Sequence, residues 1–90
     1  MPTFQIPEYF TEFTDQRPLL EVEADNLDEA FDQLFTIYPD VKAKIINPEG
    51  GVHPFIMVFV GKYHINALNG LRTKLEKDDI ISLLINLAGG

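Results

Sequence analysis

The sequence predicts one α+β domain, with a mixed β-sheet and one main helix packed on one of its faces. Three observations indicate this class: an amphipathic helical stretch over residues 26–38, and two apolar stretches of strand length over residues 55–60 and 80–85. A helix that lies between strands and buries a single apolar stripe has to cover one face of their sheet. The length of 90 residues fits a single domain. A hydrophobic fraction of 46% is ordinary for a globular chain.

The helix has a clear beginning and a clear end. Asn26 is expected to be its N-cap, and Glu29, three residues later, is expected to complete a capping box. Apolar side chains recur at helical spacing from Leu27 to Tyr38. Pro39 then stops the helix. A short second helix is expected over residues 41–46, followed by a loop.

Five segments are predicted to be strands: residues 3–6, 19–24, 55–60, 63–65 and 80–85. Between the first two strands, residues 7–18 contain three aromatic side chains and then a turn. This order suits a β-grasp, or ubiquitin-like, fold, with one domain over residues 1–86 and a flexible tail over 87–90. The alternation in the strands and the helical stripe together predict a core that includes Leu27, Phe31, Leu34, Ile56, Val58, Val60, Ile81 and Leu83.

Charge and composition narrow the functional classes. The formal charge of −7 disfavours nucleic-acid binding, because an acidic surface repels phosphates. The absence of cysteine rules out a disulfide framework and a cysteine nucleophile. His53 and His64 do not stand at ligand spacing with each other or with carboxylates, so no metal site is expected. No signal peptide or membrane span is recognisable, which favours a cytoplasmic protein without membrane contact.

The second half of the chain carries a recognisable pattern in the segments 55–60, 61–62, 68–75, 78–84 and 88–90. This pattern resembles that of the MoaD/ThiS family of ubiquitin-like sulfur carriers. Two positions depart from the family pattern. Asp78-Asp79 replaces a common Gly-Asp, so Asp78 is expected to keep the turn by adopting left-handed backbone. The stretch Ile85-Asn86-Leu87 lacks a proline that many members carry there.

The resemblance implies a function for the tail Ala88-Gly89-Gly90. In the family, an ATP-dependent activating enzyme adenylates the terminal carboxylate, and sulfur then replaces the adenylate to give a thiocarboxylate. Gly90 would be the reacting residue here. The protein would be a carrier rather than an enzyme and would bind no cofactor itself, because ATP and the sulfur donor are used by its activating partner. A sulfur-accepting synthase or large subunit would be its second partner, in molybdopterin, thiamin or cysteine biosynthesis.

Three alternatives remain open from the sequence. The chain could be the small subunit of a molybdopterin synthase and complete a catalytic site with its tail. It could be a ubiquitin-like modifier that becomes joined to lysines. It could also be a β-grasp adaptor that never reacts, in which case removal of Gly89-Gly90 would have no effect.

A partner-binding patch is predicted on the sheet face opposite the helix. Both faces of the strand at 55–60 are apolar, whereas a solvated sheet face should alternate with polar residues. Such an apolar excess usually marks an interface. The predicted patch consists of Phe55, Met57, Phe59, Ile80, Leu84 and, at the start of the tail, Leu87. Alternatively, Tyr9, Phe10 and Phe13 fold back over this face, or two copies of the chain pair through it.

Overall fold

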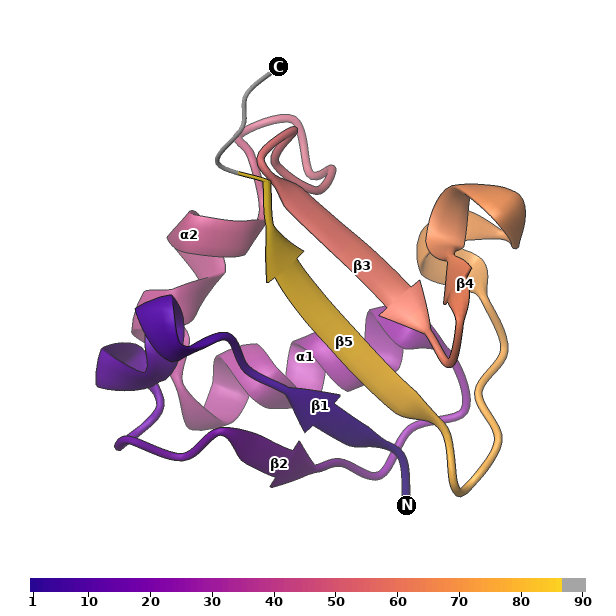
Figure 1. The fold of residues 1–90 in the computed structure, drawn as a ribbon, viewed down its shortest axis with the longest axis horizontal. Helices are drawn as coiled ribbons and strands as arrows, with labels where there is room; N and C mark the ends of the chain where they lie inside the picture. Colours follow the sequence, from indigo (N-terminus) through magenta and orange to yellow (C-terminus); the bar gives the residue numbers. More distant parts are fainter. Residues whose placement is uncertain (87–90) are drawn as a thin grey trace.

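The computed structural model describes residues 1–86 and confirms the predicted α+β class (Figure 1). Its five-stranded sheet has the order β2-β1-β5-β3-β4. The parallel pairing of β1 with β5 lies at the centre, and the other neighbours are antiparallel. This is the β-grasp arrangement. The strands are β1 (Thr3–Gln5), β2 (Leu19–Glu21), β3 (Ile56–Val60), β4 (Tyr63–His64) and β5 (Ile80–Ile85).

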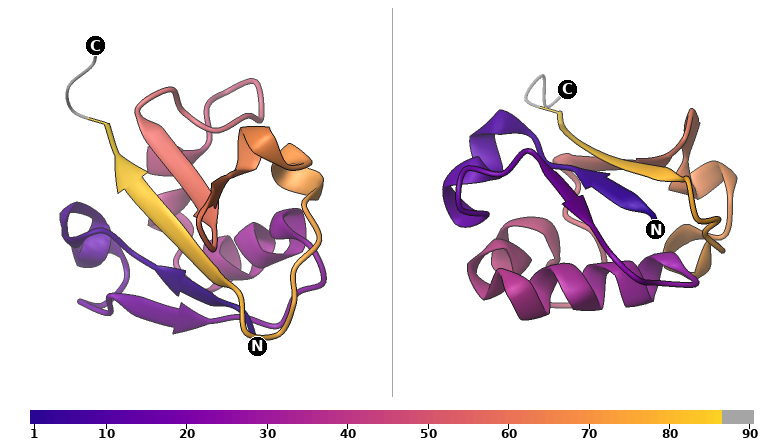
Figure 2. Two further views of the ribbon diagram at one scale, coloured as in Figure 1. Left: turned by 45° about the vertical axis from the view of Figure 1, so that its right-hand side comes forward. Right: turned by 90° about the horizontal axis from the view of Figure 1, so that it is seen from below.

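The helices lie on one face of the sheet. Figure 2 shows α1 (Leu27–Ile37) and α2 (Lys42–Ile45) beneath it, which leaves the opposite face uncovered by any helix of residues 1–86. Four short 3₁₀ helices complete the described chain: η1 (Glu8–Phe13), η2 (Pro39–Val41), η3 (Ile65–Ala67) and η4 (Gly70–Arg72). No helix within residues 1–86 is long and apolar enough to cross a bilayer.

The start of α1 confirms one half of the expected cap and corrects the other. Asn26 is the N-cap, and its side-chain oxygen accepts a hydrogen bond from the Glu29 N–H at 2.9 Å. The Glu29 carboxylate, however, accepts from the N–H of Asp25 at 2.8 Å instead of that of Asn26. The chain entering the helix is extended and pairs with Lys74, and in this geometry the carboxylate reaches one residue further back.

The core lies between the sheet and α1. All eight residues predicted for it are buried, with exposed fractions of 8% or less. Phe31 stands at its centre, with its ring centroid 5.2 Å from that of Phe4 on β1 and 5.6 Å from that of Phe35. Aromatic pairs at such separations add stabilisation beyond the burial of their area. The helix is therefore joined to the middle of the sheet through one aromatic cluster.

Two turns beside the sheet show how the backbone is constrained. Gly61 has φ +60° in the turn between β3 and β4, a conformation that glycine adopts without a steric penalty. The expectation of left-handed backbone at Asp78 is wrong, because Asp15 and Gln16 are the non-glycine residues with positive φ in the described chain. The turn before β5 is held instead by the carboxylate of Asp79, which accepts a hydrogen bond from the Glu76 N–H at 2.7 Å.

Candidate docking face and tail exit

The face of the sheet that no helix covers, called the outer face below, is formed by alternate residues of all five strands. One row crosses the sheet completely: the strand register joins Leu19 to Gln5, Gln5 to Ser82, Ser82 to Phe59 and Phe59 to His64. On one side of this row Met57 is opposite Leu84, and on the other Thr3 is opposite both Ile80 and Glu21.

The structure brings some of the predicted patch residues together and separates others. Met57 and Leu84 are direct cross-strand neighbours, and Phe59 lies two residues along β3 on the same face. Ile80 lies beyond Ser82, whose hydroxyl is 3.1 Å from the Gln5 side-chain oxygen, so a polar pair interrupts the apolar surface. Phe55 precedes β3 and is 59% exposed at the end of the molecule. Leu87 lies outside the described residues.

Exposure along the outer face is uneven. Leu84 is 46% exposed and Ile80 38%, whereas Met57 and Phe59 are half-buried. The Phe59 ring meets the His64 imidazole edge-on, with 5.3 Å between the ring centroids. Within β3 and β5 the most accessible apolar side chain of this face is therefore Leu84.

The outer face is almost free of charge, although the chain is strongly acidic. Within residues 1–86, the rows that the strand register defines contain one residue of the Asp, Glu, Lys and Arg types, Glu21. The chain as a whole has 14 acidic and 7 basic residues. Depletion of charge together with accessible apolar side chains is the composition that distinguishes the centre of protein interfaces.

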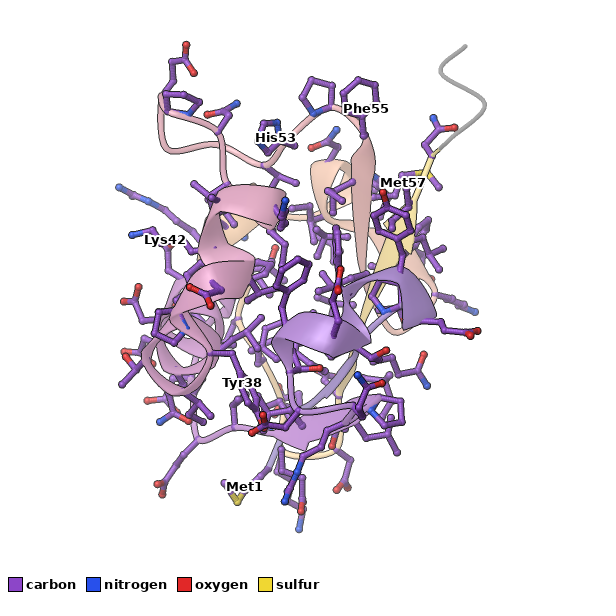
Figure 3. All side chains as sticks on the ribbon, turned by 90° about the vertical axis from the view of Figure 1, so that its left-hand side faces the viewer. Met1, Tyr38, Lys42, His53, Phe55 and Met57 are labelled. Atoms are coloured by element: carbon purple, nitrogen blue, oxygen red, sulfur yellow. The ribbon has the colours of Figure 1, made fainter. Side chains whose placement is uncertain are left out.

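The end of β5 fixes where the tail leaves the sheet. The N–H of Asn86 donates to the carbonyl of Phe55 at 2.7 Å, so the pairing of β5 with β3 extends one residue beyond the strand. Figure 3 shows Phe55 and His53 at the same end of the molecule, opposite Met1. The predicted reactive tail, Ala88, Gly89 and Gly90, lies outside the described residues.

The aromatic residues of the segment 7–18 pack on the helix side of the sheet. Phe10 is a buried member of the core, and the Lys44 ammonium of α2 lies 5.3 Å from the centre of the Phe13 ring. Tyr9 and Phe10 line a hollow with Ala43 and Lys44 and also with Phe55, the one residue of the predicted patch within residues 1–86 that lines it. In the described chain these aromatic residues are thus placed beside α2, and Leu84 and Ile80 stay exposed.

The remaining candidates for chemistry do not converge. His64 uses its Nδ1 to accept a hydrogen bond from the Asn66 N–H at 3.0 Å, which caps η3. Within residues 1–86 no group of three or more His, Asp or Glu side chains is arranged to hold a metal ion. Sequence reasoning missed the outer-face residues of three strands, which are Thr3 and Gln5 of β1, Leu19 and Glu21 of β2, and His64 of β4. The alternation of these strands contained the signal, but each strand is too short for it to be distinctive.

A mixed five-stranded sheet of this order, with its helices on one face, defines a ubiquitin-like β-grasp protein. A chain in the crystal structure of the Amycolatopsis orientalis BexX/CysO complex has the same fold, with a TM-score of 0.91 and 24% identity, and covers 100% of both chains. The crystal structure of Mycobacterium tuberculosis CysO matches with a TM-score of 0.90 and 20% identity over 97% of this chain and 100% of that one.

Two further findings concern other relatives. The solution structure of small archaeal modifier protein 1 from Methanosarcina acetivorans has a TM-score of 0.83 and 21% identity, covering 99% of this chain and 95% of that one. In sequence, the chain is 29% identical over 75 residues to a protein of Archaeoglobus fulgidus named "Putative sulfur carrier protein", covering 79% of this chain and 83% of that one. No protein-family model matches. The match in sequence agrees with the resemblance to MoaD/ThiS-like sulfur carriers, and the solved structures show the same β-grasp fold.

Proposed function

We propose that this chain carries sulfur as a thiocarboxylate on Gly90. A partner enzyme would first join the carboxylate of Gly90 to the adenylyl group of ATP, with release of pyrophosphate. A sulfur nucleophile would then displace AMP from the carbonyl carbon. The chain is the substrate in both steps, and its activating partner holds ATP and the sulfur donor.

The observation that carries this proposal is the position of the tail exit beside the outer face. The sheet holds the chain up to Asn86, which is hydrogen-bonded to Phe55. Gly90 stands four residues further on, and four residues can span about 13 Å when extended. A partner that grips the outer face could therefore receive the carboxylate in an active site of its own.

Glycine at the last two positions suits such a delivery. A residue without Cβ passes through a narrow channel and adopts unusual backbone angles at little steric cost. A side chain on residue 90 would crowd the carbonyl carbon under attack. The similarity in sequence to the Archaeoglobus protein supports the same chemistry.

The partners and pathway follow from the same reasoning. The Amycolatopsis relative was crystallised in a complex with BexX, which supports a second partner that accepts the sulfur here. We expect that acceptor to act in cofactor biosynthesis, for molybdopterin or thiamin, or in cysteine biosynthesis. A stable complex with a large subunit would favour the role of a molybdopterin synthase subunit instead.

The likeness to small archaeal modifier protein 1 favours one further candidate, a protein modifier. Both roles begin with the same adenylate, but a modifier ends as an isopeptide bond to lysine. Mass spectrometry of cell extracts for branched peptides that end in Gly89-Gly90 separates the two roles.

Pyrophosphate exchange tests the first step. With the activating enzyme of the same organism, ATP and labelled pyrophosphate, the full chain should support exchange, and a chain lacking Gly89 and Gly90 should not. The matched control is Ile37→Ala, because Ile37 is an exposed residue of α1 that belongs neither to the outer face nor to the cavity beside β3. Equal exchange with the truncated chain would show that the reactive group lies elsewhere.

A further inference from the structure

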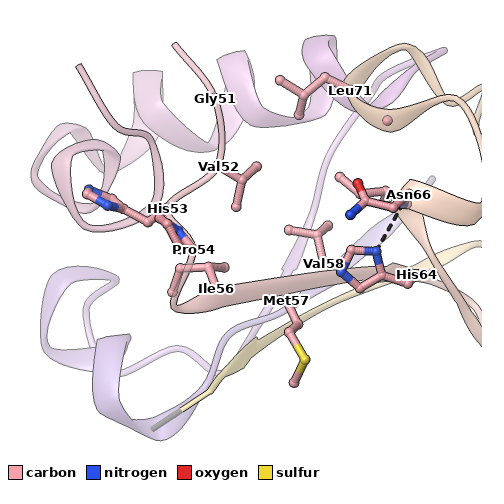
Figure 4. Close-up of a pocket in the computed structure, with 12 residues that line it drawn as sticks. Gly51, Val52, His53, Pro54, Ile56, Met57, Val58, His64, Asn66 and Leu71 are labelled. Atoms are coloured by element: carbon pink, nitrogen blue, oxygen red, sulfur yellow. Dashed lines mark hydrogen bonds between the residues drawn. The ribbon is translucent and has the colours of Figure 1, made fainter. Parts of the chain in front are cut away.

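A cavity of about 370 Å³ lies along β3 on the side away from β5. Figure 4 shows Val52 and Leu71 on one side of it, His53 and Pro54 at one end, and His64 with Asn66 at the other. Val58 and Ile56, both buried, form part of its wall. The cavity therefore opens directly beside the strand that lies next to β5.

This edge of β3 is only partly paired. In the described chain β4 pairs with Phe59 and Val60, and no strand pairs with residues 56–58 on that side. The Asn86 N–H donates to the Phe55 carbonyl, and the Gly61 N–H donates to the Ile80 carbonyl. Because hydrogen-bonded pairs alternate along antiparallel strands, the backbone N–H and C=O groups of the odd-numbered residues of β3 point toward β5. The backbone groups of Ile56 and Val58 consequently point the other way, and the Ile56 N–H is bonded to the His53 carbonyl.

Within residues 1–86, the walls of the cavity lack acidic, lysine and arginine side chains, and His53 and His64 are their two titratable residues. None of its twelve lining residues is Asp, Glu, Lys or Arg, in a chain with 21 such residues, the sum of 14 acidic and 7 basic. A charged side chain that entered here would lose hydration without gaining an ionic partner. An apolar side chain on an extended backbone meets no such penalty and finds a strand edge that is only partly paired.

The cavity and the outer face border each other across β3. Met57 contributes to the cavity lining, yet its side chain points to the other side of β3, where it is opposite Leu84. His64 lines the cavity and also contacts Phe59. A strand added beside Ile56–Val58 would alternate its side chains, one toward the cavity and the next toward the outer face.

We propose that an extended, uncharged segment of the activating enzyme adds to the partly paired edge of β3 beside residues 56–58 and inserts one apolar side chain into the cavity. This rests on the proposed function, because the same enzyme docks on the outer face. The mode is strand addition, in which main-chain hydrogen bonds give affinity and a pocket for an alternate side chain gives specificity.

A pair of matched charge substitutions tests this inference. Asn66 and Asn69 are both exposed, but Asn66 lines the cavity and Asn69 does not. Asn66→Glu should weaken binding of the activating enzyme at least tenfold, about 1.4 kcal/mol, whereas Asn69→Glu should change the Kd less than twofold. Circular dichroism establishes that both variants fold. In the wild-type complex, hydrogen exchange at the Val58 amide should slow at least tenfold relative to the free chain.

The outcomes are distinguishable. If the enzyme supports pyrophosphate exchange but the two variants bind equally well and Val58 exchange is unchanged, strand addition is wrong and the proposed function stands. If the free chain dimerises through this edge and Asn66→Glu abolishes the dimer alone, the occupant is a second copy and the inference is also wrong. If the wild-type chain neither supports pyrophosphate exchange nor binds the activating enzyme, the proposed function and the strand addition are both wrong.

Discussion

Leu84 exposes 46% of its surface although it lies on the central strand β5. Its neighbours on the outer face are Met57 across the strand and Ser82 along it. Full burial of a leucine side chain is worth roughly 1.5–3 kcal/mol, so covering Leu84 would recover part of that amount. We expect Leu84 to be a main contact of the proposed docking face, and a more informative one than Phe59, which is half-buried against His64.

Leu84→Glu should weaken binding of the activating enzyme at least tenfold, because it places an ionised carboxylate within the apolar contact. Its matched control is Leu68→Glu, which makes the same change at an exposed leucine outside the sheet. Calorimetric titration measures both affinities, and circular dichroism verifies the fold. Equal affinities for the two folded variants would exclude the outer face as the docking surface.

At the scale of the elements, α1 holds the sheet through Phe31. Its ring contacts Phe4 on β1 and Phe35 on the next turn of the helix. Phe31→Ala should lower the free energy of unfolding by about 3–5 kcal/mol, the usual cost of a cavity left by a buried aromatic ring. Ile37→Ala, on the exposed side of the same helix, should change it by about 0.5 kcal/mol or less. Chemical denaturation measures both, and similar losses would mean that Phe31 is not central to the packing.

The elements with strong patterns were predictable from the sequence, whereas those that depend on distant partners were not. The strands 56–60 and 80–85 and the helix 27–37 carry long apolar patterns, so their positions and buried faces were predicted correctly. The 3₁₀ helix of residues 8–13 was not predicted, because its six residues have one buried side chain, Phe10, and no regular period.

The candidate site shows the same limit. Alternation correctly assigned Met57, Phe59, Ile80 and Leu84 to one face, since that property is local to each strand. Alternation also places Ser82 on that face between Ile80 and Leu84. It could not place Gln5 beside Ser82, because this follows from the parallel register of β1 with β5, two segments that lie far apart in the chain. The interruption of the apolar patch by a polar pair is therefore a finding of the structure.

At the scale of the whole molecule, the proposed function depends on one surface and on one end of the chain. The outer face is nearly free of charge on an acidic protein, and the chain leaves the sheet beside it at Asn86. The net charge of −7 attracts a basic partner from a distance. The outer face, which is nearly free of charge, is then the surface on which that partner docks. The proposed role of Gly90 depends on this combination.

Intact mass spectrometry of the protein tests the central claim most directly. After incubation with the activating enzyme, ATP and a sulfur donor, replacement of one carboxylate oxygen by sulfur should raise the mass by about 16 Da. Fragmentation should place the gain on Gly90, and a chain lacking Gly89 and Gly90 should show none. An unchanged mass in the full chain after adenylation is established, or an equal gain in the truncated chain, would contradict the account.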